Sequence, residues 1–142
     1  MSTKEHKIGE IVAEHHRREG PLLPILHAVQ AEYGCVDAES EALIAKGLNL
    51  SRADVHGVVS FYHDFRDRAD PRPVVQVCHA EACKARGVEG IIAEATAAAG
   101  DRVKIETVYC LGLCSSGPSA RVGDRLHARL DGPKLSAIIE NA

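Results

Sequence analysis

The apolar residues in positions 1–70 recur at the three- and four-residue spacing of amphipathic helices. Ser51 and Asp54 stand at the spacing of a capping box, with Asp54 in place of the usual glutamate. Because the connections between the apolar segments are short, a small helical bundle is the simplest packing. The pattern predicts four helices: one that starts around Ile8 and ends near Gly20, one over 22–33 capped by Gly34, one over 42–48, and one over 55–61.

Residues 71–142 have a different pattern, in which strand-like and helix-like segments alternate. Strands are predicted over 74–78 and 103–108, with an alanine-rich helix over 88–99 between them that stops at Gly100. Two short runs, 120–122 and 125–127, flank Gly123-Asp124 and predict a hairpin, and a last helix follows over 135–139 with Asp131 as its N-cap. The order strand–helix–strand, hairpin, helix is thioredoxin-like, so we expect an α+β chain.

The boundary between the two patterns lies at Asp70-Pro71-Arg72-Pro73, where proline disfavours helix at the preceding residue. Residues 1–70 hold 8 basic and 12 acidic side chains, a net charge of −4, whereas residues 71–142 hold 9 and 8, a net charge of +1. We therefore expect two domains, a helical bundle over 1–70 and a thioredoxin-like α/β domain over 71–142.

Composition narrows the classes of function. The net charge of −3 gives no basic surface for nucleic acid. No apolar run approaches the roughly 20 residues of a membrane span, and the charged start MSTKEHKIGE does not resemble a secretion signal. We therefore expect a cytoplasmic protein, in which thiols stay reduced. The five cysteines then need a role other than structural disulfides.

Four of these cysteines form two spaced pairs, Cys78-x4-Cys83 and Cys110-x3-Cys114. Each pair follows one of the two strands predicted to flank the alanine-rich helix, and in a parallel strand–helix–strand unit both strand ends lie at the same sheet edge. Four thiolates there would suit a soft metal centre. Zinc sites usually pair cysteines as C-x2-C, so the longer loops favour a [2Fe–2S] cluster. A zinc site and simple burial in the core remain alternatives.

The motifs C78-HAEA-C83 and C110-LGL-C114, behind a helical N-terminal half, resemble the thioredoxin-like [2Fe–2S] subunit of respiratory complex I and its relatives. These relatives include the diaphorase subunit of NAD-linked hydrogenases and the gamma subunit of NAD-dependent, molybdenum-containing formate dehydrogenases. The segments GPLLPILHAVQ (20–30) and LNLSRADVHGVVSFYHDFR (48–66) are most similar to the formate dehydrogenase subunit. The short stretch between Cys83 and Cys110 favours the same choice.

The resemblance implies that Cys78 and Cys83 hold one iron and that Cys110 and Cys114 hold the other. It also implies an electron-transfer subunit that is not a catalyst by itself, beside a flavin subunit with FMN, a [4Fe–4S] cluster and the NAD site. Formate oxidation at a molybdenum cofactor would belong to a further subunit. In keeping with this, the chain has no G-x-G-x-x-G and no P-loop. The alternative functions are the equivalent subunit of complex I or of an NAD-linked hydrogenase, a free-standing thioredoxin-like ferredoxin, and a zinc-binding module.

Other residues are open to two interpretations. Cys35, alone after Gly34, is expected to pack at a helix end. His79 lies inside the first cysteine loop, where its charge could tune the potential of a cluster. The segment 61–65 holds both phenylalanines and one of the three tyrosines, and it either packs the two domains together or docks the flavin subunit. By analogy with thioredoxin-like folds, the Gly117–Pro118 peptide is expected to be cis.

Overall fold

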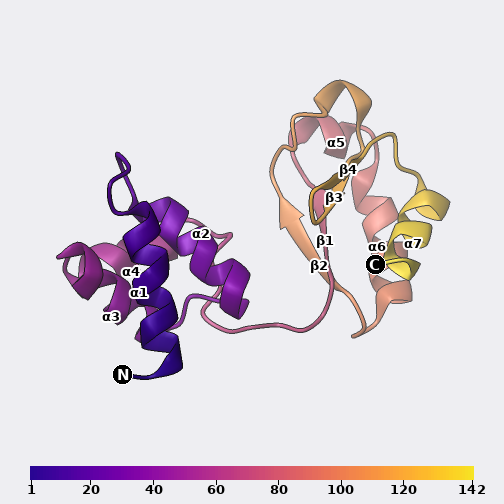
Figure 1. The fold of residues 1–142 in the computed structure, drawn as a ribbon. Coiled ribbons are helices and arrows are strands. Elements are labelled where there is room, and N and C mark those ends of the chain that lie inside the picture. Colours follow the sequence, from indigo (N-terminus) through magenta and orange to yellow (C-terminus); the bar gives the residue numbers. More distant parts are fainter. The chain divides into compact units, whose positions relative to one another are not determined.

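The computed structural model describes all 142 residues, which form two compact units, Met1–Asp70 and Pro71–Ala142 (Figure 1). The boundary between the units lies in the stretch 70–73, which contains two prolines and has neither helix nor strand. None of the helices is both long and apolar enough to span a lipid bilayer.

The first unit consists of four helices, as predicted: α1 (Thr3–His15), α2 (Leu22–Tyr33), α3 (Ala38–Leu48) and α4 (Arg52–Phe61). Gly34 ends α2 in the left-handed conformation, with φ of 76°, and Ser51 and Asp54 form the predicted capping box of α4. The prediction for the first helix was wrong at its end. It stops at His15 rather than near Gly20, because its buried face ends at Val12 and polar residues follow.

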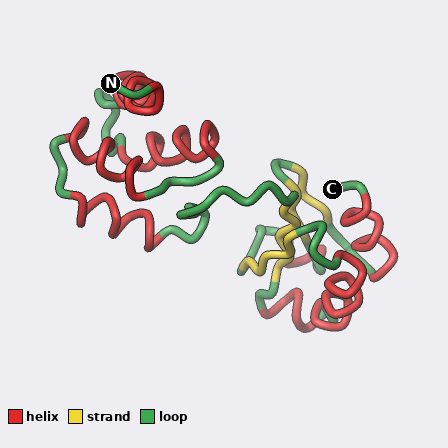
Figure 2. The backbone as a smooth tube through the Cα atoms, turned by 90° about the horizontal axis from the view of Figure 1, so that it is seen from below, coloured by secondary structure: helices red, strands yellow, loops and turns green.

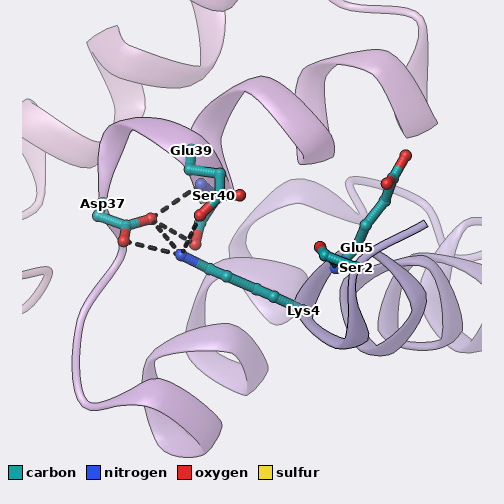
Figure 3. Close-up of polar contacts among 6 residues, drawn as sticks. All are labelled: Ser2, Lys4, Glu5, Asp37, Glu39 and Ser40. Carbon is teal, nitrogen blue, oxygen red and sulfur yellow. Dashed lines mark hydrogen bonds and ion pairs between the residues drawn. The ribbon is translucent and has the colours of Figure 1, made fainter.

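Apolar side chains from all four helices fill the core of this unit. The most deeply buried are Ile8, Ile25, Leu26, Val29, Val36, Ile44 and Val55. An ion pair joins α1 to the start of α3: Lys4 Nζ lies 2.8 Å from Asp37 Oδ2 and 3.0 Å from Glu39 Oε2 (Figure 3). The hydrogen bonds from Lys4 and from the Ser40 backbone N–H lower the pKa of Asp37 to about 2. Asp37 is also the N-cap of α3, so one carboxylate serves both contacts.

The strands, yellow in Figure 2, all belong to the second unit. They form one four-stranded sheet in the order β2-β1-β3-β4. β1 (Val74–Cys78) and β2 (Lys104–Val108) are parallel, whereas β3 (Ala120–Val122) and β4 (Arg125–His127) form an antiparallel hairpin beside β1. α6 (Val88–Ala99) and α7 (Gly132–Glu140) pack side by side (Figure 1). Valines of β1 and residues of both helices make a second core: Val75, Val77, Val88, Ala95, Leu135 and Ile139. The α+β expectation is confirmed.

The structure adds two short helices that periodicity does not indicate. α5 (Glu81–Ala85) contains Cys83, and the 3₁₀ helix η1 (Cys114–Ser116) begins at Cys114. With five and three residues, they are too short to show a hydrophobic period. The other elements of this unit lie where the sequence predicts them, including Asp131 as the N-cap of α7. The Gly117–Pro118 peptide is cis, as expected.

Candidate metal centre

The parallel pairing of β1 and β2 brings the two cysteine loops to one edge of the sheet. Cys78 is the last residue of β1 and is in register with Val108, the last residue of β2. Cys110 follows β2 by two residues rather than ending it, and its backbone has φ of 80°. This left-handed conformation is unusual for a residue with a side chain. The backbone N–H of Cys110 donates to Cys78 Sγ at 3.2 Å, so this hydrogen bond joins the two loops directly.

Cys78 and Cys83 form the buried pair, since each is 2% exposed. The backbone N–H groups of Ala80 and Cys110 donate to Cys78 Sγ at 3.4 and 3.2 Å. Burial raises the pKa of the Cys78 thiol, but these hydrogen bonds and one from Cys83 outweigh it, so that the pKa is lowered. The fold therefore favours the thiolate of Cys78, which is the form that binds metal.

Cys110 and Cys114 form the exposed pair, with their Sγ atoms 3.4 Å apart. That separation is well beyond the roughly 2.05 Å of a disulfide bond, and both thiols are free. The backbone N–H of Gly112 donates to Cys110 Sγ at 3.3 Å. Gly112 has a positive φ of 78°, which glycine adopts more readily than other residues. The hydrogen bond with Cys110, followed by the charge of that neighbour, raises the pKa of Cys114.

The donor set fits a [2Fe–2S] cluster. The site offers four soft sulfur ligands in two pairs, with backbone N–H donors aimed at Cys78 and Cys110, and a cluster of this type takes two cysteines on each iron. No three histidine, cysteine, aspartate or glutamate side chains, these cysteines included, are arranged to hold a single metal ion. The loop at Gly117 leaves room for the buried pair, because a Cβ on this glycine would lie 2.9 Å from Cys83 Sγ.

The other sequence candidates lie around or outside this site. Cys35 belongs to the first unit and is half-buried just after α2. His79 follows Cys78; its backbone N–H donates to Val108 O at 2.8 Å, and its Nδ1 is buried without a hydrogen-bond partner. Phe61 and Tyr62 are 74% and 43% exposed.

Sequence reasoning missed Ser119, a fully buried residue whose hydroxyl lies 3.8 Å from Cys83 Sγ. It is 36 residues from Cys83 in the chain, so no local spacing points to the contact.

Curated relatives of this chain belong to NAD(P)-linked redox complexes. One component of the NADH-quinone oxidoreductase of Rhizobium meliloti is 27% identical over 148 residues, which are 98% of this chain and 88% of the relative. The HndA component of the NADP-reducing hydrogenase of Solidesulfovibrio fructosivorans is 26% identical over 132 residues, or 87% of this chain and 77% of the relative. The chain therefore corresponds to most of one polypeptide in both complexes.

The fold also occurs in a solved structure, that of an NAD⁺-reducing [NiFe]-hydrogenase in the air-oxidized state. The superposition has a TM-score of 0.70 at 24% identity and covers 84% of this chain but 22% of the hydrogenase chain. At this identity the similarity shows a shared fold. The model of the thioredoxin-like [2Fe–2S] ferredoxin family matches residues 8–142, nearly the whole chain. This protein therefore belongs to the thioredoxin-like [2Fe–2S] ferredoxin family, and the [2Fe–2S] cluster is the cofactor that the family implies.

Proposed function

We propose that this chain is an electron-transfer subunit of an NAD-linked oxidoreductase complex and is not catalytic by itself. Cys78 and Cys83 hold one iron of a [2Fe–2S] cluster, and Cys110 and Cys114 hold the other. The observation that carries the proposal is the meeting of two free thiol pairs at one sheet edge, joined by the hydrogen bond from Cys110 N–H to Cys78 Sγ. A [2Fe–2S] cluster, when bound, accepts and releases single electrons.

The protein groups around the sulfurs suit this role. Thiolate ligands carry negative charge, and backbone N–H groups of Ala80, Cys110 and Gly112 point at two of them. The Cys78–Cys83 pair is buried, which keeps water from that side, whereas Cys110 and Cys114 are exposed. The exposed pair is therefore the side that a redox partner approaches.

The parent complex is proposed at two levels. The curated relatives support a complex of the NADH-quinone oxidoreductase or NAD(P)-linked hydrogenase type. FMN, NAD and a [4Fe–4S] cluster on a neighbouring flavin subunit are what the family resemblance implies. The narrower assignment, the gamma subunit of a molybdenum-containing formate dehydrogenase in the cytoplasm, stays a prediction from segments 20–30 and 48–66. The broader class has more support, because the relatives named above belong to it.

The helical unit is proposed to dock this subunit on the flavin subunit. Phe61 is 74% exposed at the end of α4 and packs edge-on against Tyr62, with ring centroids 5.0 Å apart. The ring centroid of Phe65 lies 6.4 Å from that of Tyr62, and Phe65 is itself 8% exposed. Aromatic residues are enriched at protein–protein interfaces relative to the rest of the protein surface. A free-standing ferredoxin would have no need of this unit.

The first experiment tests the metal centre. The full chain, purified under exclusion of air, should contain about two irons and two labile sulfides, absorb visible light, and give an S = ½ EPR signal when reduced. One bound zinc without iron would show that the site is a zinc module instead.

The second experiment tests the complex and the docking surface. The tagged full chain is recovered from its own cells, the co-purifying subunits are identified, and NAD⁺ reduction is measured with formate and with hydrogen, alongside NADH oxidation by quinone. Formate-dependent NAD⁺ reduction would support the narrower assignment, and a chain that co-purifies with no flavin subunit would contradict the proposal.

Within the same preparation, Phe61→Ala should weaken the association at least about tenfold, since truncating an aromatic hot spot costs about 2 kcal/mol or more. Leu126→Ala, on β4 and 52% exposed, is the matched control and should retain the partner. Equal retention of both variants would rule out docking through Phe61.

A further inference from the structure

Ser119 contacts both cysteines of the buried pair. Its side-chain Oγ lies 3.8 Å from Cys83 Sγ, and its backbone carbonyl accepts a hydrogen bond from Cys78 N–H at 3.0 Å. Ser119 directly precedes β3, which pairs with β1. The end of β1 and the sulfur on α5 are therefore both linked to one residue.

The surroundings of Ser119 leave its hydroxyl little choice of partner. The residue is 0% exposed, so bulk water does not reach it. The preceding loop packs directly on the same sulfur, because a Cβ on Gly117 would lie 2.9 Å from Cys83 Sγ. A buried hydroxyl without a hydrogen-bond partner is destabilising, and Cys83 Sγ is the contact that the structure offers to Ser119 Oγ.

Metal binding would fix the direction of this hydrogen bond. In the free protein either the Cys83 thiol or the Ser119 hydroxyl can donate. A cysteine that ligates iron is a thiolate and has no proton to donate. The hydroxyl of Ser119 then becomes the donor and the Cys83 sulfur the acceptor.

We propose that Ser119 is a positioning residue that donates its O–H to the iron-bound Cys83 thiolate and thereby raises the reduction potential of the cluster. Reduction adds negative charge, and a hydrogen bond to a charged acceptor strengthens as that charge grows. The proposal rests on the ligand set given above. Among the hydrogen bonds to the cysteine sulfurs, the other donors outside the cysteines are backbone N–H groups, those of Ala80, Leu111 and Gly112. Ser119 is thus the contact that a side-chain substitution can remove.

The test compares two pairs of proteins, each made in the full chain. The first pair is the wild type and Ser119→Ala, which removes the hydroxyl of the native residue. The second pair is Ser119→Thr and Ser119→Val, which are matched in volume and differ in whether they carry a hydroxyl. Ser115→Ala, an exposed serine of the same loop, is the control. Iron content is measured first, and the midpoint potential is then determined by EPR-monitored redox titration.

Ser119→Ala and Ser119→Val should have more negative midpoints than the wild type and Ser119→Thr, respectively. The expected change is up to about tenfold in the equilibrium constant, or about 59 mV for one electron. Ser115→Ala should match the wild type. Loss of the cluster from the Ala and Val variants, but not from Thr, would support the hydrogen bond from residue 119 to the Cys83 thiolate and would overturn the assignment of its effect to the potential alone.

Two results would overturn the inference: equal midpoints within each pair, or loss of the cluster from Ala, Thr and Val alike, which would assign the effect to packing. Either result counts against the inference only if the wild-type chain holds the cluster. A wild-type chain without iron would instead contradict the proposed function, so the two failures are distinguishable.

Discussion

Replacing Gly117 by alanine tests how tightly the loop after the second cysteine pair packs on the first. The backbone of Gly117 has φ of −70° and ψ of 169°, which an alanine adopts without strain. The cost is therefore steric. The new Cβ would lie 2.9 Å from Cys83 Sγ, 3.5 Å from Arg86 Cδ and 3.6 Å from Cys83 Cα. The first distance is well inside the roughly 3.5–4.0 Å at which nonbonded atoms attract each other.

The magnitude depends on whether Cys83 can move. Extra methyl groups in a packed interior cost about 1–3 kcal/mol, and Cys83 is 2% exposed. In the metal-free protein the thiol can turn about its one side-chain torsion and relieve part of the contact. A sulfur bound to iron cannot turn away. Gly117→Ala should therefore reduce the retention of iron more than it reduces the stability of the metal-free chain.

Iron content per chain and urea unfolding of the metal-free protein measure the two effects separately. Gly90→Ala is the control in the same unit, because Gly90 lies in α6 with nothing within 4 Å of an added Cβ. It should leave iron unchanged and stabilise the chain by about 0.5–1 kcal/mol. If Gly117→Ala holds as much iron as the wild type and unfolds at the same urea concentration, the loop does not constrain Cys83 and the reasoning fails.

Three further predictions concern single contacts. Cys110→Ser should lose iron and visible absorption, because a hydroxyl oxygen is a harder and poorer ligand for iron than a thiolate. Cys35→Ser should keep both, and the opposite pattern would show that the ligand assignment is wrong. The lowered pKa of Asp37, about 2, means that the stabilisation from its carboxylate is present above about pH 4 and lost as the pH falls towards 2. Asp37→Asn should thus cost about 1 kcal/mol or less at pH 6, since the side chain is 40% exposed, and the difference in urea unfolding should shrink in acid; a constant difference would contradict this. Ser51→Ala should destabilise the first unit by about 1 kcal/mol by removing the cap on Asp54 N–H, and an unchanged melting temperature would rule out that contribution.

The elements of this fold were predictable where a periodic pattern or a cap residue marks them. Gly34, Ser51 and Asp131 each stand at the helix end that their chemistry predicts. The end of α1 was missed because Gly20, although its φ is positive, lies beyond a polar stretch that no longer packs on the core. α5 was missed because five residues are too few for a period.

The cysteine pairs were predictable because strand order alone decides where they meet. Because β1 and β2 pair in parallel, the carboxyl ends of both strands lie at one edge of the sheet. The order of strands and cysteines is therefore sufficient to bring the two loops together. The contact between Ser119 and Cys83 joins residues 36 apart, and it depends on how the loop after η1 passes over α5. Such a contact is set by packing in three dimensions, and a single sequence carries no pattern for it.

The difference between these two kinds of contact explains which substitutions the site should tolerate. Apart from the neighbouring cysteines, the donors to Cys78 and Cys110 are backbone N–H groups, and these donors depend on local conformation and not on side-chain identity. Cys110 at φ of 80° is a strained conformation of the kind that costs about 1–3 kcal/mol, and its N–H reaches Cys78 Sγ from there. Many loop side chains can therefore vary without moving a sulfur. Besides Gly112, whose φ is positive, sensitivity should be concentrated at Gly117 and Ser119, where an added or removed group changes the surroundings of Cys83 itself.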